Sequence, residues 1–268
     1  MVVYLDDIAV FGDTKEQVLE DTLETISRLA AAGFMINLKK SQLVEETAKV
    51  LGHQWHSGGF WAPCTSKLEA LLTKTDDELA RMSRSSLYGL LNFFREYVPS
   101  FAEVTEPLRA LLGQDAREWT KEAANAVRTV VQRVTTTPRW LNFDPECELR
   151  VESRVCKSGL AIVLLQRHPE AKRTWCPVAS WGRCLEFLEC EEPKVLLELR
   201  ALKEGFWKLA EFTAYAKKLV VSISPLLKSL LKLSNRTHPT LQALVIDLLQ
   251  YKPKFLVPDF HEPCSTPP

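Results

Sequence analysis

The sequence predicts a mixed α/β fold, and three observations support this prediction. Two apolar, strand-like runs flank a pair of adjacent carboxylates within the first eleven residues. Apolar residues then recur at helical spacing in three stripes between residues 66 and 113. From residue 148 onward, three strand-like runs precede a helix, a strand and further helices. We therefore expect an α+β segment, a small helical bundle and an α/β segment, in that order.

Composition bounds the class of protein. The length of 268 residues allows roughly two domains, and 46% apolar with 25% charged residues is typical of a soluble globular protein. We find no apolar run of membrane-spanning length and no basic region followed by an apolar stretch, so we expect neither membrane insertion nor secretion. The seven cysteines are widely spread without a C-x-x-C pair, which favours thiols of an intracellular protein. With 34 basic and 34 acidic residues, any nucleic-acid binding must be local.

The first element is a hairpin over residues 2–11, with Tyr4-Leu5-Asp6-Asp7 at its tip. Adjacent carboxylates there offer the hard oxygen ligands that a divalent metal ion needs. The alternative is that Asp-Asp serves only as hairpin-turn chemistry. The tetrapeptide alone does not decide between these interpretations.

A helix and a second hairpin follow. Thr14, with Gln17 three residues later, predicts a helix start, and Gly33 predicts its end. Residues 49–55 and 57–61 predict paired strands. His53 and His56 lie three apart in one strand, so we expect their rings on opposite faces rather than on one metal.

The helical stripes between residues 66 and 113 consist of apolar side chains at positions 68, 71 and 72, then 87, 90, 91 and 94, then 101, 104, 108 and 111. Basic residues lie between them and could meet the phosphates of a nucleic-acid duplex: Lys67, Lys74, Arg81, Arg84 and Arg95. A solvated helix face explains any one of these residues equally well.

In the last part of the sequence, the pattern predicts a helix over 121–135 and strands over 149–153, 159–166 and 176–181. A helix over 194–214, a strand over 219–223 and helices over 225–233 and 241–249 follow. These elements complete the α/β segment of the fold class.

The order of motifs resembles the reverse transcriptases of LTR retrotransposons and retroviruses. A Y-x-D-D hairpin at residues 4–7 is followed by a G-F-x-I-N-x-x-K-S-x-L stretch at 33–43 and a Leu51-Gly52-His53 strand start. Residues 85–102 are similar to the family's thumb signature, and 106–112 to its A-x-P-L-x-x-L-L sequel. Trp119-Thr120 and the stretch 137–141 match further family positions. Val50 departs from the pattern, because an aromatic residue is usual there.

The resemblance implies a domain map and a set of roles. It divides the chain into the end of a polymerase palm (1–62), a helical thumb (63–115), a linker with a helix (116–147), an RNase H-like domain with a mixed sheet (148–258) and a tail (259–268). Asp6 and Asp7 are then catalytic ligands of Mg²⁺ or Mn²⁺. Tyr4, Leu51, Gly52 and His53 contact nucleotide or primer, and the basic residues of the thumb contact an RNA/DNA template–primer.

The RNase H-like part departs from the family's catalytic pattern. Glu152 stands where the family has the aspartate of T-D-A-S, Glu198 matches the helix acid, and Ser222 replaces the aspartate of T-D-H. Because two-metal hydrolysis needs several converging carboxylates, we expect this site to be degenerate and unable to cut RNA. The domain then resembles the connection domain of retroviral polymerases.

The resemblance also implies parts that residues 1–268 do not contain, namely the fingers and the palm strand with a third metal-binding aspartate. We therefore expect a truncated reverse transcriptase, inactive alone, whose partners are the missing polymerase segment and a downstream RNase H domain. Its expected place is the cytoplasm or a virus-like particle. Two alternatives stay open: a non-enzymatic, host-retained module that binds nucleic acid or protein, and a residual ribonuclease H.

Overall fold

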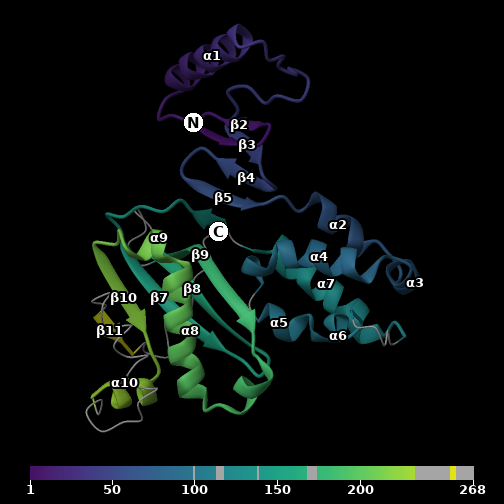
Figure 1. Ribbon diagram of the computed structural model, residues 1–268, viewed down its shortest axis with the longest axis vertical. Coiled ribbons are helices and arrows are strands. Elements are labelled where there is room, and N and C mark those ends of the chain that lie inside the picture. Colours follow the sequence, from purple (N-terminus) through teal and green to yellow (C-terminus); the bar gives the residue numbers. More distant parts are fainter. Residues whose placement is uncertain (99, 113–117, 138, 168–173, 233–253, 258–268) are drawn as a thin grey trace. The chain divides into compact units, whose positions relative to one another are not determined.

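A computed structural model describes residues 1–98, 100–112, 118–137, 139–167, 174–232 and 254–257. The chain divides into two compact units, unit 1 (Met1–Cys64) and unit 2 (Thr65–Pro268), each seen in Figure 1. Within the described residues no helix combines the length and the apolar character needed to cross a membrane. The domain boundaries expected from the sequence stay predictions, because the two units divide the chain on a coarser scale.

Unit 1 begins with the expected hairpin and helix. Strands β1 (Val2–Tyr4) and β2 (Asp7–Ala9) pair antiparallel, with Tyr4 opposite Asp7. Helix α1 (Lys15–Ala31) starts where the sequence predicts, because the Thr14 hydroxyl accepts a hydrogen bond from the Gln17 N–H at 3.2 Å. It ends before Gly33, whose φ of +86° suits glycine.

The second half of unit 1 is an antiparallel meander of three strands. They are β3 (Thr47–Val50), β4 (His53–His56) and β5 (Phe60–Pro63). Residues Leu51 and Gly52 form the first turn, and both have positive φ, the backbone that two-residue hairpins favour. Trp55 and Trp61 lie opposite each other and stack, with ring centroids 5.6 Å apart.

Unit 1 has almost no core of its own. Every residue from 1 to 64 is described, and Pro63 alone among them is buried. The apolar stripe of α1 is only half-buried or exposed, and several large side chains are mostly in solvent: Val3, Leu5, Phe34, Met35 and Leu38. Local capping and turn chemistry therefore define these elements more than burial does.

The first part of unit 2 is a helical bundle with more and shorter helices than the three predicted stripes. Its members are α2 (Ser66–Leu72), α3 (Asp76–Ala80), α4 (Arg84–Phe93), the 3₁₀ helix η1 (Arg95–Tyr97), α5 (Phe101–Val104), α6 (Glu106–Arg109) and α7 (Lys121–Thr135). New helix starts divide the stripes: a capping box at Thr75, a cap at Ser83, and Ser100 at a positive φ.

Helix α7 packs against the other helices of the bundle, although the sequence suggested a helix within a linker. Its inner face is buried from end to end, with Val127, Val130 and Val131 fully inaccessible. Small and β-branched side chains at helical spacing let α2, α3, α4, α5 and α6 pack around it. Helix α7 therefore belongs to the bundle's core.

A five-stranded mixed sheet forms the rest of unit 2, as the fold class predicted. Its strands are β7 (Glu148–Val155), β8 (Gly159–Arg167), β9 (Trp175–Cys184), β10 (Lys218–Ser222) and β11 (Lys254–Leu256). The spatial order is β11-β10-β7-β8-β9, with β10 parallel to β7 and to β11 and the other pairs antiparallel. Strand β11 was not predicted, and the expected helix 241–249 lies outside the described residues.

Helix α8 (Lys194–Lys208) covers one face of this sheet, which Figure 1 shows. It approaches β8 so closely that a Cβ on Gly205 would collide with the side chain of Ile162. The predicted helix 194–214 is interrupted at Leu209, after which the short α9 (Ala210–Thr213) follows. Helix α10 (Pro225–Lys232) packs against α8.

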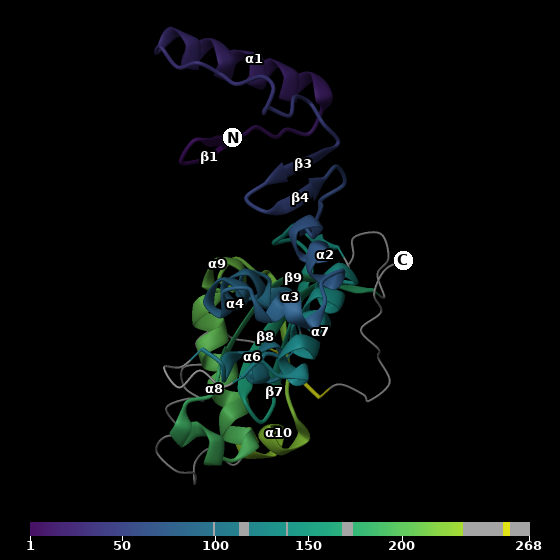
Figure 2. The same cartoon turned by 90° about the vertical axis from the view of Figure 1, so that its right-hand side faces the viewer.

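The bundle and the sheet pack together inside unit 2, and Figure 2 views the sheet from the bundle's side. The Ser180 hydroxyl of β9 donates a hydrogen bond to the Glu96 carbonyl of η1 at 2.8 Å. The rings of Tyr97 and Trp140 lie 4.9 Å apart, with Trp140 in the short strand β6 (Trp140–Leu141). The bundle and the sheet therefore share one compact unit.

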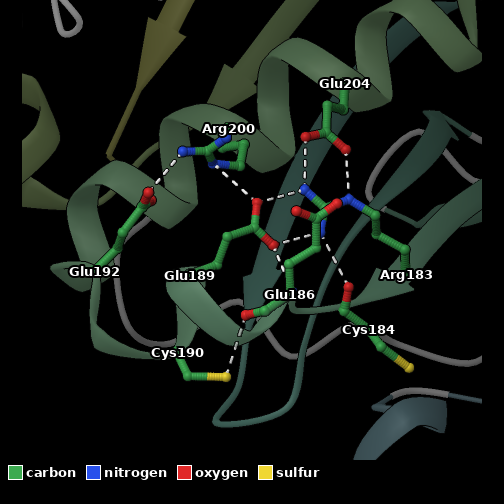
Figure 3. A network of polar contacts seen from close by, with 8 residues as sticks. All are labelled: Arg183, Cys184, Glu186, Glu189, Cys190, Glu192, Arg200 and Glu204. Carbon is green, nitrogen blue, oxygen red and sulfur yellow. Dashed lines mark hydrogen bonds and ion pairs between the residues drawn. The ribbon is translucent and has the colours of Figure 1, made fainter.

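An ion-pair network joins β9, the 3₁₀ helix η2 (Phe187–Glu191) and α8 (Figure 3). The Arg183 guanidinium donates to both carboxylate oxygens of Glu189 at 2.6 and 2.7 Å, and to both oxygens of Glu204 at 2.7 Å. Arg200 reaches the same Glu189 carboxylate at 3.2 Å. Hydrogen bonds from Arg183 lower the pKa of Glu189 to about 2. This buried carboxylate therefore stays ionised and ties helix to sheet.

Candidate active site

The carboxylates of the first hairpin lie where a ligand from solvent can reach them. Asp6 is in the two-residue turn and Asp7 is the first residue of β2, and both are exposed. Leu5, the other turn residue, has a φ of +51° and is 84% exposed. A leucine in the left-handed region costs about 1 kcal/mol or more, and such outliers concentrate at functional sites.

The second hairpin turn repeats this feature. Leu51 has a φ of +50° and is 44% exposed, beside Gly52. The ring of His53 packs edge-on against Trp61 at 5.2 Å, and burial lowers the pKa of His53 below its ordinary value. His53 is therefore neutral at neutral pH and serves as a packed element of the turn.

The donor set of the first hairpin suits a hard divalent cation in kind, because Asp6 and Asp7 are adjacent carboxylates. Two carboxylates are, however, too few ligands to hold such an ion by themselves. In the part of the chain that the structure describes, no group of three histidine, cysteine or acidic side chains could hold a metal ion. A metal ion at Asp6 and Asp7 would need a further ligand from outside these residues.

The basic residues predicted to bind nucleic acid are distributed over the bundle. Lys67 is exposed on α2, Arg84 begins α4, and Arg95 lies in η1. Hydrogen bonds from Thr75 lower the pKa of Glu78, and the charges of Lys74 and Arg81 lower it further, so part of their charge faces an acid of the bundle itself. The structure thus distributes these cations over several separate elements of the bundle.

The structure brings Glu152 and Ser222 together but puts a cation between them. The two residues are register partners on β7 and β10. Arg150 donates from Nε to the Ser222 hydroxyl at 2.8 Å, and its terminal nitrogen lies 3.0 Å from the Glu152 carboxylate. Only 6% of the Arg150 side chain is exposed. A guanidinium group thus neutralises the one carboxylate of this pair.

Glu198 does not converge with Glu152, so the residues of the expected degenerate site do not all lie on one face of the sheet. Helix α8 covers the sheet face of Ile162, and register places Ser153 on that face and Glu152 on the other. Glu198 instead accepts hydrogen bonds from the N–H and the hydroxyl of Ser224, at 2.7 and 2.6 Å. Glu198 and Glu152 therefore cannot share metal ions, as a two-metal site requires of its carboxylates.

Arg150 was not predicted as the partner of both Glu152 and Ser222. A signal was present in the alternation of β7, where residues 148, 150, 152 and 154 are all charged and so share one face. This two-residue alternation predicts that Arg150 and Glu152 lie side by side on one face of the sheet. It also separates Glu152 from the apolar face under α8.

Two family models match the chain. Residues 1–55 match the reverse transcriptase (RNA-dependent DNA polymerase) model, and residues 119–221 match the RNase H-like domain found in reverse transcriptase. Together they account for more than half of the residues. The chain belongs to the reverse transcriptases of retroelements. This reverse transcriptase fragment combines the Y-x-D-D hairpin of unit 1 with the RNase H-like domain of unit 2.

Relatives and solved structures agree with this assignment. The Tf2-3 transposon polyprotein of Schizosaccharomyces pombe is 25% identical over 173 residues, which are 64% of this chain and 13% of the polyprotein. A foamy viral protease-reverse transcriptase in complex with double-stranded DNA superposes with a TM-score of 0.73 at 21% identity, over 98% of this chain and 46% of that one.

A foamy viral protease-reverse transcriptase in complex with an RNA/DNA hybrid gives a TM-score of 0.72 at 22% identity, over 100% of this chain and 36% of that one. At this identity the likeness establishes the fold. Reverse transcriptases as a family use divalent metal ions, and the neighbouring complexes contain nucleic acid. The reverse transcriptase fragment spans a small part of the polyprotein it matches.

Proposed function

We propose that this chain supplies the metal-binding hairpin and a template–primer surface of an RNA-directed DNA polymerase, and that its RNase H-like domain is not a nuclease. The observation that carries the proposal is the pair of turns in unit 1. Each turn contains an exposed leucine with a positive φ, Leu5 in the first and Leu51 in the second. The strained leucine lies directly beside a candidate functional residue, Asp6 or Gly52. Membership of the family gives these turns their roles.

Asp6 and Asp7 are the proposed ligands of Mg²⁺ or Mn²⁺. A bound divalent ion would lower the pKa of the attacking primer hydroxyl and neutralise charge on the leaving phosphate. The hairpin's contribution is to hold two carboxylates side by side at an exposed tip. A third ligand and the nucleotide-binding fingers would come from polymerase residues beyond those of this chain.

Leu51 and Gly52 are the proposed contacts to the primer, and His53 next to them supports the turn. Leu51 exposes an apolar side chain at the tip of the turn, and the glycine beside it lets a backbone approach closely. Because His53 is neutral and packed against Trp61, we assign it to holding the turn rather than to pairing with phosphate. Lys67 and Arg84 on the bundle are the proposed phosphate contacts.

The proposal assigns no hydrolysis to the RNase H-like domain. Arg150 already neutralises Glu152, and Glu198 lies on the other sheet face with Ser224 as its partner. A residual ribonuclease would need these acids to share metal ions. Cleavage of an RNA/DNA hybrid by the purified chain, abolished by Glu198→Gln, would contradict this assignment.

Binding is tested by fluorescence anisotropy of a labelled RNA/DNA template–primer with the full chain. We expect binding that weakens as salt rises, because phosphate contacts release counterions. The double variant Lys67→Gln/Arg84→Gln should reduce the affinity several-fold, and Lys208→Gln, an exposed lysine of α8, should leave it unchanged. Absence of any template–primer binding would overturn the proposal.

Chemistry is tested by primer extension with Mg²⁺ or Mn²⁺. We expect no extension by the chain alone, and extension once a polypeptide carrying the remaining polymerase ligand and fingers is added. Asp6→Asn/Asp7→Asn should abolish it, whereas Glu16→Gln/Glu20→Gln, which neutralises two exposed acids of α1, should not. Reconstituted extension that survives Asp6→Asn/Asp7→Asn would exclude the hairpin as the metal site.

A further inference from the structure

The meander of β3, β4 and β5 in unit 1 (Figure 1) carries three aromatic rings on one face. His53 and Trp55 are two residues apart in β4, and Trp61 is the register partner of Trp55 on β5, so the three side chains share one side of the sheet. The rings of Trp55 and Trp61 are inclined by 17° with centroids 5.6 Å apart, and Trp61 meets His53 edge-on. The three rings therefore form a packed row.

Trp55 is the exposed end of this row. It is 41% exposed, whereas Trp61 and His53 are half-buried. Stacking on Trp61 covers one face of the Trp55 indole, and because β4 lies between β5 and β3, the other face is directed toward β3. The residue of β3 opposite Trp55 is Ala48. Since a methyl group is too small to cover an indole, the outer face of this ring is open to a ligand.

The backbone at the edge of the meander is already occupied. Strand β3 is the outermost described strand on its side of the sheet. The Lys49 N–H points away from β4 and donates a hydrogen bond to Gln42 Oε1 at 2.9 Å. An added strand would need this donor. A ligand of this face is therefore recognised by the rings, which favours a flat aromatic group over an extended polypeptide.

We propose that the outer face of the Trp55 indole stacks on an unpaired nucleobase of a single nucleic-acid strand. The inference rests on the proposed function, because Trp55 lies on the strand that leaves the Leu51–Gly52 turn assigned to the primer. Three residues of strand separate Trp55 from Gly52, about 10 Å, which corresponds to about three nucleotides at 3.4 Å each. Neighbouring bases cover both faces of a base within a duplex, so the partner is a base of a single-stranded overhang.

The packing of the row suits this ligand. Every base has a π face, and one base stacked on an aromatic side chain typically changes the affinity by about tenfold or more. Trp61 fixes the orientation of the Trp55 ring before any ligand arrives, so little side-chain freedom is lost on binding. Stacking carries no requirement for a particular base, and we expect this contact to be independent of sequence.

Two oligonucleotides of equal length separate the base from the backbone in a direct test. Fluorescence anisotropy measures the affinity of the full chain for a labelled short oligothymidylate and for an abasic oligodeoxynucleotide with the same number of phosphates. We expect the oligothymidylate to bind about tenfold more tightly. Trp55→Leu should remove most of this difference, and Trp55→Phe should keep most of it, because a phenyl ring still stacks.

Two results of this titration would overturn the proposal. Equal affinity of the unaltered chain for the two oligonucleotides would show that no base is bound and would leave this face to a protein partner. A preference for the oligothymidylate that survives Trp55→Leu would place the stacked base at another site.

Ala48→Ile tests the same contact without changing the tryptophan. Isoleucine is favoured in strands, so β3 should keep its pairing while the larger side chain covers the indole face that Ala48 leaves open. The affinity for the oligothymidylate should fall as in Trp55→Leu, and the affinity for the abasic oligonucleotide should not change. This variant decides the question if Trp55→Leu disturbs the meander, because unchanged oligothymidylate affinity in Ala48→Ile would overturn the proposal.

Trp207→Leu is the matched control. Trp207 is 68% exposed on α8, and the Lys208 ammonium lies 4.3 Å from its ring centroid. Both affinities should be unchanged in this variant, and equal losses in Trp207→Leu and Trp55→Leu would overturn the proposal.

The two proposals can fail separately. Template–primer binding that depends on Lys67 and Arg84, with no effect of Trp55→Leu on the oligothymidylate, would overturn this inference alone. A chain that distinguishes the two oligonucleotides through Trp55 but binds no template–primer would overturn the proposed function alone.

Discussion

The two units of this chain obtain their structure in different ways. In unit 1 the strands and the helix follow from turn residues and caps, and Pro63 is the one buried residue among positions 1–64. In unit 2 the same local signals come with a core in which Phe206, Leu164 and Leu199 are fully buried. Local sequence can therefore specify elements that only further burial can stabilise.

The difference matters because burial is the main favourable term in folding. A fully buried leucine or phenylalanine contributes about 1.5–3 kcal/mol relative to an exposed one. Unit 1 leaves Leu5, Phe34 and Met35 at least 65% exposed, so this contribution is not realised within the unit. We therefore expect unit 1 to be much less stable than unit 2, which is stabilised by its own packing.

The largest expected contrast comes from equivalent truncations in the two units. Phe206→Ala removes a fully buried ring from unit 2 and should cost about 3–5 kcal/mol of the free energy of unfolding. Ile26→Ala acts on a half-buried side chain of α1, and alanine's helix propensity offsets the loss, so the effect should stay below about 1 kcal/mol. Urea unfolding followed by circular dichroism measures both free energies of unfolding. Equal losses in the two variants would contradict the contrast between the units.

Removing the centre of the ion-pair network should be nearly as costly. Arg183→Gln leaves the buried carboxylate of Glu189 without its main partner, which should destabilise unit 2 by about 3–5 kcal/mol. Arg154→Gln is the control, because 70% of that side chain is exposed and its pair with Glu152 should contribute at most about 1 kcal/mol. Similar unfolding midpoints for the two variants would show that the network does not stabilise the unit.

The same network predicts how unit 2 responds to acid. The pKa of Glu189 is about 2 in the folded chain against an ordinary value of 4.5, so the folded carboxylate binds protons less readily than the unfolded one. Its contribution of about 3 kcal/mol is complete above pH 4.5 and is lost as the pH falls from 4.5 to 2. Stability of Glu189→Gln should vary less over this window, and an unchanged acid profile would contradict the assignment.

A smaller effect tests how closely helix and sheet approach. Gly205→Ala places a methyl group against Ile162, so α8 must shift from β8 at a cost of about 1–3 kcal/mol. Gly89→Ala in α4 has no atom within 4 Å of the new Cβ, and should be neutral or stabilising by up to about 1 kcal/mol. Thermal unfolding of the two variants gives the sign, which should differ between them.

The smallest expected effect concerns the strained turns of unit 1. Leu51→Asn keeps a side chain but tolerates the φ of +50°, so the β3–β4 hairpin should gain about 1 kcal/mol or less. Template–primer affinity should fall at the same time, because the exposed leucine is lost. A variant that neither stabilises the hairpin nor weakens binding would show that the strain has no functional counterpart.

Motifs and periodicity predicted most of the elements and the family of this chain. Thr14, Gly33 and the Leu51-Gly52 turn each marked an element boundary, because caps and turns depend on a few neighbouring residues. Strand β11 was not predicted, because its pairing with β10 depends on contacts between residues far apart in the sequence. A short strand of this kind has no periodicity to reveal it.

The residues of the candidate site could be proposed from the sequence, but their geometry could not. Asp6 and Asp7 could be named from the motif, and the structure places them at the expected exposed tip. Glu152 and Glu198 matched family positions one at a time, yet register puts them on opposite faces of the sheet. The alternation of charged residues in β7 could have placed Arg150 beside Glu152, but its hydrogen bond to Ser222 required the pairing of β10 with β7.

The most direct test of the contrast between the two units is amide hydrogen exchange of the full chain, measured by mass spectrometry. We expect amides of β7, β8 and α8 to exchange only through global unfolding of unit 2. Amides of α1 and of strands β1 to β5 should exchange faster by several orders of magnitude, because local opening there costs little. Protection of unit 1 equal to that of unit 2 would contradict the account, since it would show that unit 1 is stable without further chain to cover it.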